Sequence, residues 1–211
     1  MKIEQARAGD ERGGLDEASV QADPLEQLRI WLDDAGQAQV IEPHAMCVAT
    51  VNQQGHPSQR MVLLRGLDSR GLVFYTSYES RKGRQIGENP HVSAVFWWAS
   101  MQRQVRVEGV AARISEEESD AYFAGRPRGH QLAAWASDQS EVVESRRLLE
   151  ERMEHFEQRF EEEEVPRPHS WGGYLIVPSR VEFWQGRPNR MHDRLEFLRA
   201  GGTWLVRRLQ P

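Results

Sequence analysis

Hydrophobic side chains recur at two different periods along the chain, and the change of period divides it into elements. Near the beginning they follow a helical spacing, with five apolar side chains on one face: Leu25, Leu28, Trp31, Leu32 and Ala35. Asp23-Pro24-Leu25-Glu26 supplies an N-cap, a proline at the first helical position and an acid in the first turn. The pattern predicts a helix that begins there and ends near Gly36.

From residue 45 onward, short apolar runs separated by turn residues are typical of β-strands. Between residues 104 and 111 apolar and polar side chains alternate, and Gly109 beside Val110 predicts a bulge. The predicted strands are 45–51, 60–64, 72–76, 91–98, 104–111, 174–177, 181–184 and 203–207. Because sequential strands joined by short turns favour an antiparallel sheet or barrel, we expect a mainly β fold rather than a doubly wound α/β fold.

Two further helices are predicted among the strands. Ser115-Glu116-Glu117-Glu118 is a capping box, and residues 140 to about 160 are charged and helix-prone, with Leu148, Leu149, Met153 and Phe156 on one side. Residues 1–22 are polar and aperiodic, so we interpret them as a flexible arm. A single domain over 23–211 follows.

Composition narrows the class of protein. In 211 residues, 39% are hydrophobic and 28% charged, which is typical of a soluble globular chain. We expect a cytoplasmic location, because no apolar run approaches the roughly 18 residues of a membrane span and the beginning lacks the apolar centre of a signal peptide. The net charge of −5 argues against general nucleic-acid binding. Because there is a single cysteine, an internal disulfide is excluded, and because the histidines are scattered without metal-ligand spacing, we expect no metal site.

Three basic clusters are the remaining candidates for chemistry, because the chain lacks the Walker, G-x-G-x-x-G, H-E-x-x-H and G-x-S-x-G motifs. Ser80-Arg81-Lys82-Gly83-Arg84 falls at a predicted helix start, where cations and backbone N–H groups can share one phosphate. The second cluster is Arg126-Pro127-Arg128. The third, residues 190–194, places Arg190, His192 and Arg194 on one face if it is extended. A solvated basic turn and a structural histidine are the ordinary alternatives.

Eleven short motifs keep a defined order across almost the whole chain, from about residue 23 to the C-terminal Arg208-Leu209-Gln210-Pro211. They are Arg60-Met61-Val62-Leu63-Leu64, Phe74-Tyr75-Thr76, Ser80-Arg81-Lys82, Arg103-Gln104-Val105, Tyr122-Phe123, Arg126-Pro127-Arg128, Trp135-Ala136-Ser137, Gln139-Ser140, Trp171-Gly172-Gly173, Val181-Glu182-Phe183-Trp184-Gln185-Gly186 and Arg190-Met191-His192-Asp193-Arg194. As a set they resemble the pyridoxine (pyridoxamine) 5′-phosphate oxidase family.

The resemblance implies a split antiparallel β-barrel with flanking α-helices. It also implies a homodimer that holds one non-covalent flavin mononucleotide (FMN) at each of two sites between its subunits. It places Arg60, Arg81, Lys82 and Ser140 near the FMN phosphate or ribityl chain. The other FMN-contacting positions that it implies are Met61, Val62, Leu63, Tyr75, Thr76, Gln104, Gln139, Trp184 and Arg194. Elementary chemistry agrees, because a dianionic phosphate needs several positive donors and a flavin ring needs flat apolar walls.

The resemblance further implies that pyridoxamine or pyridoxine 5′-phosphate is oxidised to pyridoxal 5′-phosphate. In the reaction of that family, a hydride leaves the 4′ carbon of the substrate for flavin N5, and dioxygen then reoxidises the flavin and is reduced to hydrogen peroxide. The substrate phosphate is assigned to Tyr122 and Arg126, and the catalytic contacts over the pyridine ring to Arg190 and His192. Arg65 and His130 stand where the family usually has Lys and Ser, so we interpret both as altered phosphate donors.

Two other functions stay open at this point. One is an FMN oxidase of another aromatic substrate, such as a phenazine precursor, which Arg65 and His130 allow. The other is a flavin-binding or haem-binding split-barrel protein without turnover, which the complete motif at 190–194 disfavours.

Overall fold

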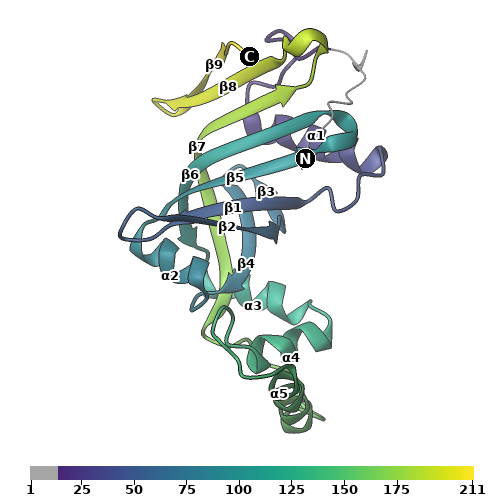
Figure 1. Ribbon diagram of the computed structural model, residues 1–211, viewed down its shortest axis with the longest axis vertical. Helices are drawn as coiled ribbons and strands as arrows, with labels where there is room; N and C mark the ends of the chain where they lie inside the picture. Colours follow the sequence, from purple (N-terminus) through teal and green to yellow (C-terminus); the bar gives the residue numbers. More distant parts are fainter. Residues whose placement is uncertain (1–13) are drawn as a thin grey trace, which may run out of the picture.

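The computed structural model describes residues 14–211 and shows one curled antiparallel sheet with helices around it (Figure 1). The strands are β1 (Ala45–Val51), β2 (Pro57–Leu63), β3 (Gly66–Asp68), β4 (Gly71–Ser77), β5 (His91–Trp98), β6 (Arg103–Arg113), β7 (Trp171–Gln185), β8 (Asp193–Ala200) and β9 (Thr203–Arg208). The helices are α1 (Pro24–Gln37), α2 (Arg81–Glu88), α3 (Glu116–Ala124), α4 (Arg128–Ala136) and α5 (Arg146–Arg159). The mainly β prediction is confirmed.

The long strand β7 connects the two parts of the sheet, as Figure 1 shows. One of its edges pairs with β6, whereas the other edge pairs first with β4 and then with β8. The register shift between Glu108 and Gly109 falls beside Pro178, and a Cβ on Gly109 would lie 2.1 Å from the carbonyl oxygen of Val177. The predicted bulge is therefore confirmed, and only glycine fits there. The two strands predicted at 174–177 and 181–184 are one continuous strand.

Helix α1 packs its apolar face on the main core. Its side chains Leu28 and Ala35 are fully buried, and the ring centroid of Trp31 lies 5.1 Å from that of Phe183. The side chain of Asp23 accepts a hydrogen bond from the N–H of Leu25 at 2.9 Å, as expected of an N-cap. The predicted helix is confirmed, with its end one residue beyond Gly36.

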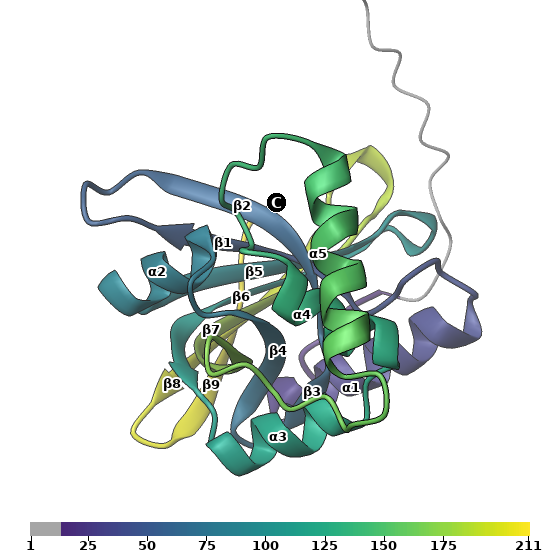
Figure 2. The ribbon, with the colours of Figure 1, turned by 90° about the horizontal axis from the view of Figure 1, so that it is seen from below.

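A second, smaller core lies at the opposite end of the sheet from β9. Figure 2 views this end, with α5 beside α4. It consists of Phe123, Leu132, Phe160, Val165 and Trp171. The predicted helix start at 140 is wrong, because Ser140 has a left-handed φ of 79° and the true N-cap is Ser145. Helix α4 was not predicted from the sequence.

Residues 14–22, within the predicted arm, lie against the C-terminal strands. Leu15 is buried, and its N–H donates to Oδ2 of Asp193 at 3.1 Å. Arg208 pairs with Glu17 at 2.6 Å and with Asp193 at 2.9 Å. Residues 1–13 of the predicted arm lie outside the described residues. No helix in the described part of the chain has the length and apolar character needed to cross a membrane.

Candidate active site

A pocket of about 1040 Å³ opens where β2, β4, α2 and the α3–α4 region meet. Its volume is at the upper end of the roughly 300–1,000 Å³ typical of small-molecule sites. Fourteen of the predicted site residues line it, namely Arg60, Met61, Val62, Leu63, Arg65, Tyr75, Thr76, Arg81, Lys82, Tyr122, Arg126, His130, Gln139 and Ser140. Segments that are far apart in the sequence therefore converge on one cavity.

Helix α2 begins at one wall of this pocket. Ser80 caps it by accepting a hydrogen bond from the N–H of Gly83 at 3.3 Å. A Cβ on Gly83 would lie 2.2 Å from the carbonyl oxygen of Tyr78, so a glycine is needed for this close approach of the helix. The first turn of α2 brings Arg81 and Lys82 to the pocket.

The Lys82 side chain is buried and has only neutral partners. Its Nζ donates to Oγ1 of Thr76 and to Oε1 of Gln139, both at 2.9 Å. Burial, followed by the nearby charge of Arg60, lowers the pKa of Lys82 to about 8. An anionic ligand at this point would favour the charged form.

The Arg60 guanidinium is held in the same way, donating to Oγ1 of Thr50 at 2.7 Å and to Oγ of Ser58 at 2.8 Å. Desolvation, followed by the charge of Arg81, lowers the pKa of Arg60. In the described part of the chain, no carboxylate forms an ion pair with Arg60, Arg81 or Lys82, which we call the cation cluster. Its uncompensated charge suits a dianionic phosphate.

An aromatic wall made of Tyr75, Tyr122 and Trp171 lines another side of the pocket. The ring centroids of Tyr75 and Tyr122 lie 3.7 Å apart, and those of Tyr75 and Trp171 lie 5.5 Å apart, with nearly parallel planes. Trp171 was not among the predicted site residues, although it stands in one of the ordered motifs. The wall offers a flat surface for a planar ligand.

Arg126 lies over this wall, with its Cζ atom 4.4 Å from the ring centroid of Trp171. Within residues 14–211, its Nη1 is the one buried side-chain nitrogen or oxygen without a hydrogen-bond partner. Burial also lowers the pKa of Arg126. Because an unsatisfied buried donor costs about 1–3 kcal/mol, this atom indicates a ligand acceptor.

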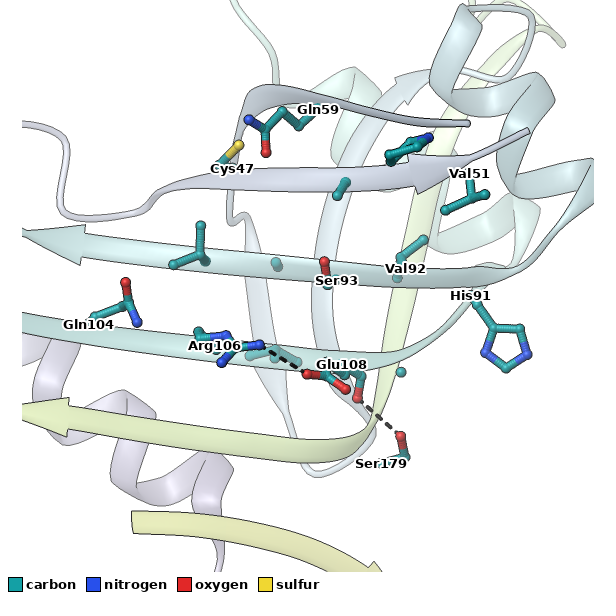
Figure 3. Close-up of a pocket in the computed structure, with 16 residues that line it drawn as sticks. Cys47, Val51, Gln59, His91, Val92, Ser93, Gln104, Arg106, Glu108 and Ser179 are labelled. Atoms are coloured by element: carbon teal, nitrogen blue, oxygen red, sulfur yellow. Dashed lines mark hydrogen bonds and ion pairs between the residues drawn. The ribbon is translucent and has the colours of Figure 1, made fainter. Parts of the chain in front are cut away.

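The other five predicted site residues lie outside this pocket, and we call them the outer group: Gln104, Trp184, Arg190, His192 and Arg194. Gln104 pairs with Trp184 across β6 and β7 and lines a separate groove of about 650 Å³ over β1, β5 and β6 (Figure 3). Trp171 begins β7 and Trp184 lies near its end, which corresponds to about 40 Å of strand at roughly 3.3 Å per residue. A single chain therefore does not bring the fourteen pocket-lining residues and the outer group into one pocket.

The turn before β8 differs from the extended segment predicted at 190–194. Residues 188–191 form a tight turn closed by a hydrogen bond from the N–H of Met191 to the carbonyl oxygen of Pro188, in which Asn189 and Arg190 have left-handed φ values of 58° and 60°. Strand β8 begins only at Asp193, so Arg190 and His192 do not share one strand face. Two consecutive left-handed residues reverse the chain, which the alternating pattern did not reveal.

His192 is nevertheless held in a defined orientation. Its Nδ1 accepts a hydrogen bond from the N–H of Arg187 at 3.1 Å, and its ring centroid lies 4.6 Å from that of Trp184. The neutral imidazole therefore carries its proton on Nε2.

Arg194 contrasts with the cation cluster because its charge is compensated. Its Nε donates to Oε1 of Glu182 at 2.8 Å, and its Nη1 donates to the carbonyl oxygen of Gln210 at 2.9 Å. The hydrogen bond with Glu182 raises the pKa of Arg194. Glu182, a buried carboxylate, also pairs with Arg106 at 3.1 Å.

The polar groups of the pocket are guanidinium, ammonium, imidazole, amide and hydroxyl groups. Among residues 14–211, no three His, Cys, Asp or Glu side chains are arranged as metal ligands. A curled antiparallel sheet with such a pocket defines a split-barrel protein suited to an anionic aromatic ligand.

Comparisons with known proteins agree with this class. Residues 32–160 match the family model described as pyridoxamine 5'-phosphate oxidase, and residues 171–211 match that of the pyridoxine 5'-phosphate oxidase C-terminal dimerisation region. The chain belongs to the pyridoxamine 5'-phosphate oxidase family, as its ordered motifs predicted.

Full-length relatives are identical to this chain at about half of the aligned positions. The pyridoxine/pyridoxamine 5'-phosphate oxidase of Rubrobacter xylanophilus is 56% identical over 200 residues, covering 95% of this chain and 92% of the relative. The protein of the same name from Synechocystis sp. is 49% identical over 211 residues, covering 100% and 99%. These names agree with the enzyme class predicted from the sequence.

A solved structure confirms the predicted split barrel. The crystal structure of PhzG from Burkholderia lata 383, in complex with tetrahydrophenazine-1-carboxylic acid, matches with a TM-score of 0.88 and 31% identity. The match covers 92% of this chain and 95% of that one.

Proposed function

We propose that this protein is an FMN-dependent oxidase that converts pyridoxamine or pyridoxine 5′-phosphate to pyridoxal 5′-phosphate, with dioxygen as oxidant and hydrogen peroxide as product. The observation that carries the proposal is the uncompensated cation cluster beside the aromatic wall in one pocket. Full-length relatives named as this oxidase support it.

The residues present fit FMN as the cofactor. The cation cluster and Ser140 suit a phosphate and a polyol chain, and residues 61–63, Tyr75, Thr76 and Gln139 supply apolar surface and hydrogen-bonding groups nearby. When bound, FMN supplies a two-electron acceptor that dioxygen can reoxidise. The protein's own contribution is to bind and orient.

A second polar group in the same pocket suits the substrate phosphate. Arg126 offers its unpartnered Nη1, and Tyr122, Arg65 and His130 line the pocket beside it. The charge of Arg65 contributes to lowering the pKa of Arg126, which indicates that the two guanidinium groups are near each other. Two cationic groups in one pocket match a reaction in which both cofactor and substrate carry phosphate.

We also propose a homodimer in which the outer group of one subunit completes the pocket of the other. The outer group lies outside the pocket of its own chain. Four of its five members fall in residues 171–211, which match the dimerisation region. A two-fold dimer would then contain two equivalent sites.

In this arrangement Arg190 and His192 would orient the pyridine ring of the substrate. The hydrogen bond from the Arg187 N–H to Nδ1 fixes the orientation of the His192 ring. Arg190 would contribute the charge and the fixed donor geometry of its guanidinium, so its role would be electrostatic positioning.

Peroxide release by the purified protein tests the proposal. We expect a yellow dimer that releases peroxide with pyridoxamine or pyridoxine 5′-phosphate. Peroxide from a reduced phenazine carboxylate alone would favour a phenazine oxidase, and bound FMN without turnover would indicate a binding protein. A colourless monomer that does not bind added FMN would contradict both the proposed cofactor and the proposed dimer.

A further inference from the structure

A buried amide lies behind the cation cluster, outside the lining of the pocket. Gln85 stands on α2, one helical turn after Lys82, and is only 5% exposed. Its Oε1 accepts hydrogen bonds from Oγ1 of Thr50 at 2.6 Å and from Oγ of Ser58 at 2.8 Å. Gln85 therefore links helix α2 to β1 and β2.

The direction of these hydrogen bonds determines how Arg60 is held. Each hydroxyl has one proton, and both protons are donated to Gln85. The oxygens of Thr50 and Ser58 are then available only as acceptors, and they receive Nη1 and Nη2 of Arg60 at 2.7 and 2.8 Å. With the amide reversed, each hydroxyl would receive two donors and its own proton would need another acceptor.

The groups that connect Gln85 to Arg60, namely the hydroxyls of Thr50 and Ser58, are electrically neutral, so they leave the charge of Arg60 uncompensated. Arg60 also donates to the carbonyl oxygen of Val48 at 3.3 Å, so within residues 14–211 its hydrogen-bond acceptors are all uncharged. A carboxylate at position 85 has the same shape as the amide and accepts the same two hydroxyls, yet it would offset the charge of Arg60. A neutral side chain orients the guanidinium and leaves its charge for the ligand.

We propose that Gln85 is a positioning residue of the phosphate site, which fixes the Arg60 guanidinium through Thr50 and Ser58 without neutralising it. The inference rests on the proposed binding of FMN in this pocket. It assigns a role to a residue that stands behind the cation cluster and outside the lining of the cavity.

The Gln85→Glu variant tests the charge argument because it keeps the size and the acceptor. FMN and riboflavin are titrated into the full-length apoprotein, with flavin fluorescence as the readout, since riboflavin lacks the phosphate. We expect the Kd for FMN to rise at least about tenfold and that for riboflavin to change less than about threefold. Gly87→Glu is the matched control, because it adds the same charge to α2 where a Cβ meets nothing within 4 Å. It should change neither Kd by more than about twofold.

The Gln85→Met variant tests the orientation argument, and it carries the test if Gln85→Glu does not fold. It removes the acceptor and adds no charge, so we expect a smaller loss, about three- to tenfold, again for FMN alone. Parallel loss of FMN and riboflavin would mean a merely structural role and overturn the inference. Unchanged FMN affinity in both variants would overturn the inference about Gln85 and leave the proposed cofactor standing. Wild-type protein that does not bind FMN would overturn both the inference and the proposed cofactor.

Discussion

The cation cluster and the arginines of β8 and β9 present the same kind of charge in opposite surroundings. Arg60 in the pocket has neutral partners and a lowered pKa. Arg194 and Arg208 are paired with Glu182, Asp193 and Glu17, and their pKa values are raised. In a chain so rich in arginine, the absence of a carboxylate partner distinguishes an anion site better than the presence of arginine does.

This difference predicts different consequences of substitution. A cation with neutral partners contributes its full charge to a bound phosphate, so its loss should appear in cofactor affinity. The charge of a paired arginine is already compensated by its carboxylate. Its loss should therefore change the orientation of the side chains and backbone that it binds rather than the affinity for the phosphate.

The largest effect is expected from Lys82→Ala or Arg81→Ala. Each should weaken FMN binding by roughly 1.5–3 kcal/mol, because each removes one charge-assisted contact with the phosphate. The Kd follows from fluorescence titration of the apoprotein. Arg84→Ala is the matched control, since Arg84 stands on the same helix but pairs with Glu141 at 2.8 Å, and it should leave the Kd nearly unchanged. Wild-type affinity in both cluster variants would place the phosphate elsewhere.

Arg190→Ala should lower kcat/KM by more than tenfold, about 1.4 kcal/mol of transition-state stabilisation, while FMN content and Tm barely change. His192→Asn should act in the same direction with a smaller effect. Steady-state kinetics of the flavin-loaded variants give the result. A variant that loses flavin or unfolds, while its residual holoenzyme turns over normally, has lost a structural residue instead.

The Kd for FMN should rise about tenfold between pH 7 and pH 9, because the pKa of Lys82 in the free protein is about 8. Binding favours the protonated amine, so affinity is fully present below this pKa and falls as the pH rises through it. The phosphate remains a dianion across this range. Lys82→Arg should flatten the profile, since a guanidinium stays protonated. An equally steep profile in that variant would assign the titration to another group.

Mixed dimers test whether the two groups meet between subunits. Co-expression of Arg126→Ala with Arg190→Ala chains should restore about a quarter of wild-type activity, because random pairing leaves one intact site in each heterodimer. Peroxide release per protein chain measures this recovery. Arg126→Ala with Lys82→Ala, both in the pocket, should show none. Activity equal to the mean of the two parents would mean that each site is built within one chain.

Most local structure could be predicted from the sequence because its causes are local. The capping residues of α1, the alternation in β6 and the glycine at the bulge each act within a few positions. The start of α5 could not be predicted, since this helix has no fully buried residue and its charged sequence continues through the loop that precedes it. The turn at Asn189 and Arg190 was missed because neither residue type requires a left-handed conformation.

The ordered motifs by themselves determined the family, and with it the residue types that an FMN and a phosphorylated substrate require. The tertiary structure alone decided which cations lack a carboxylate, and it placed Gln85 behind the cation cluster and Trp171 in the aromatic wall. It also separated Trp184 from the pocket by the length of β7. The reason is physical: pairs such as Lys82 with Gln139 join residues distant in the chain, and their burial and charge balance leave no periodic signal in the sequence.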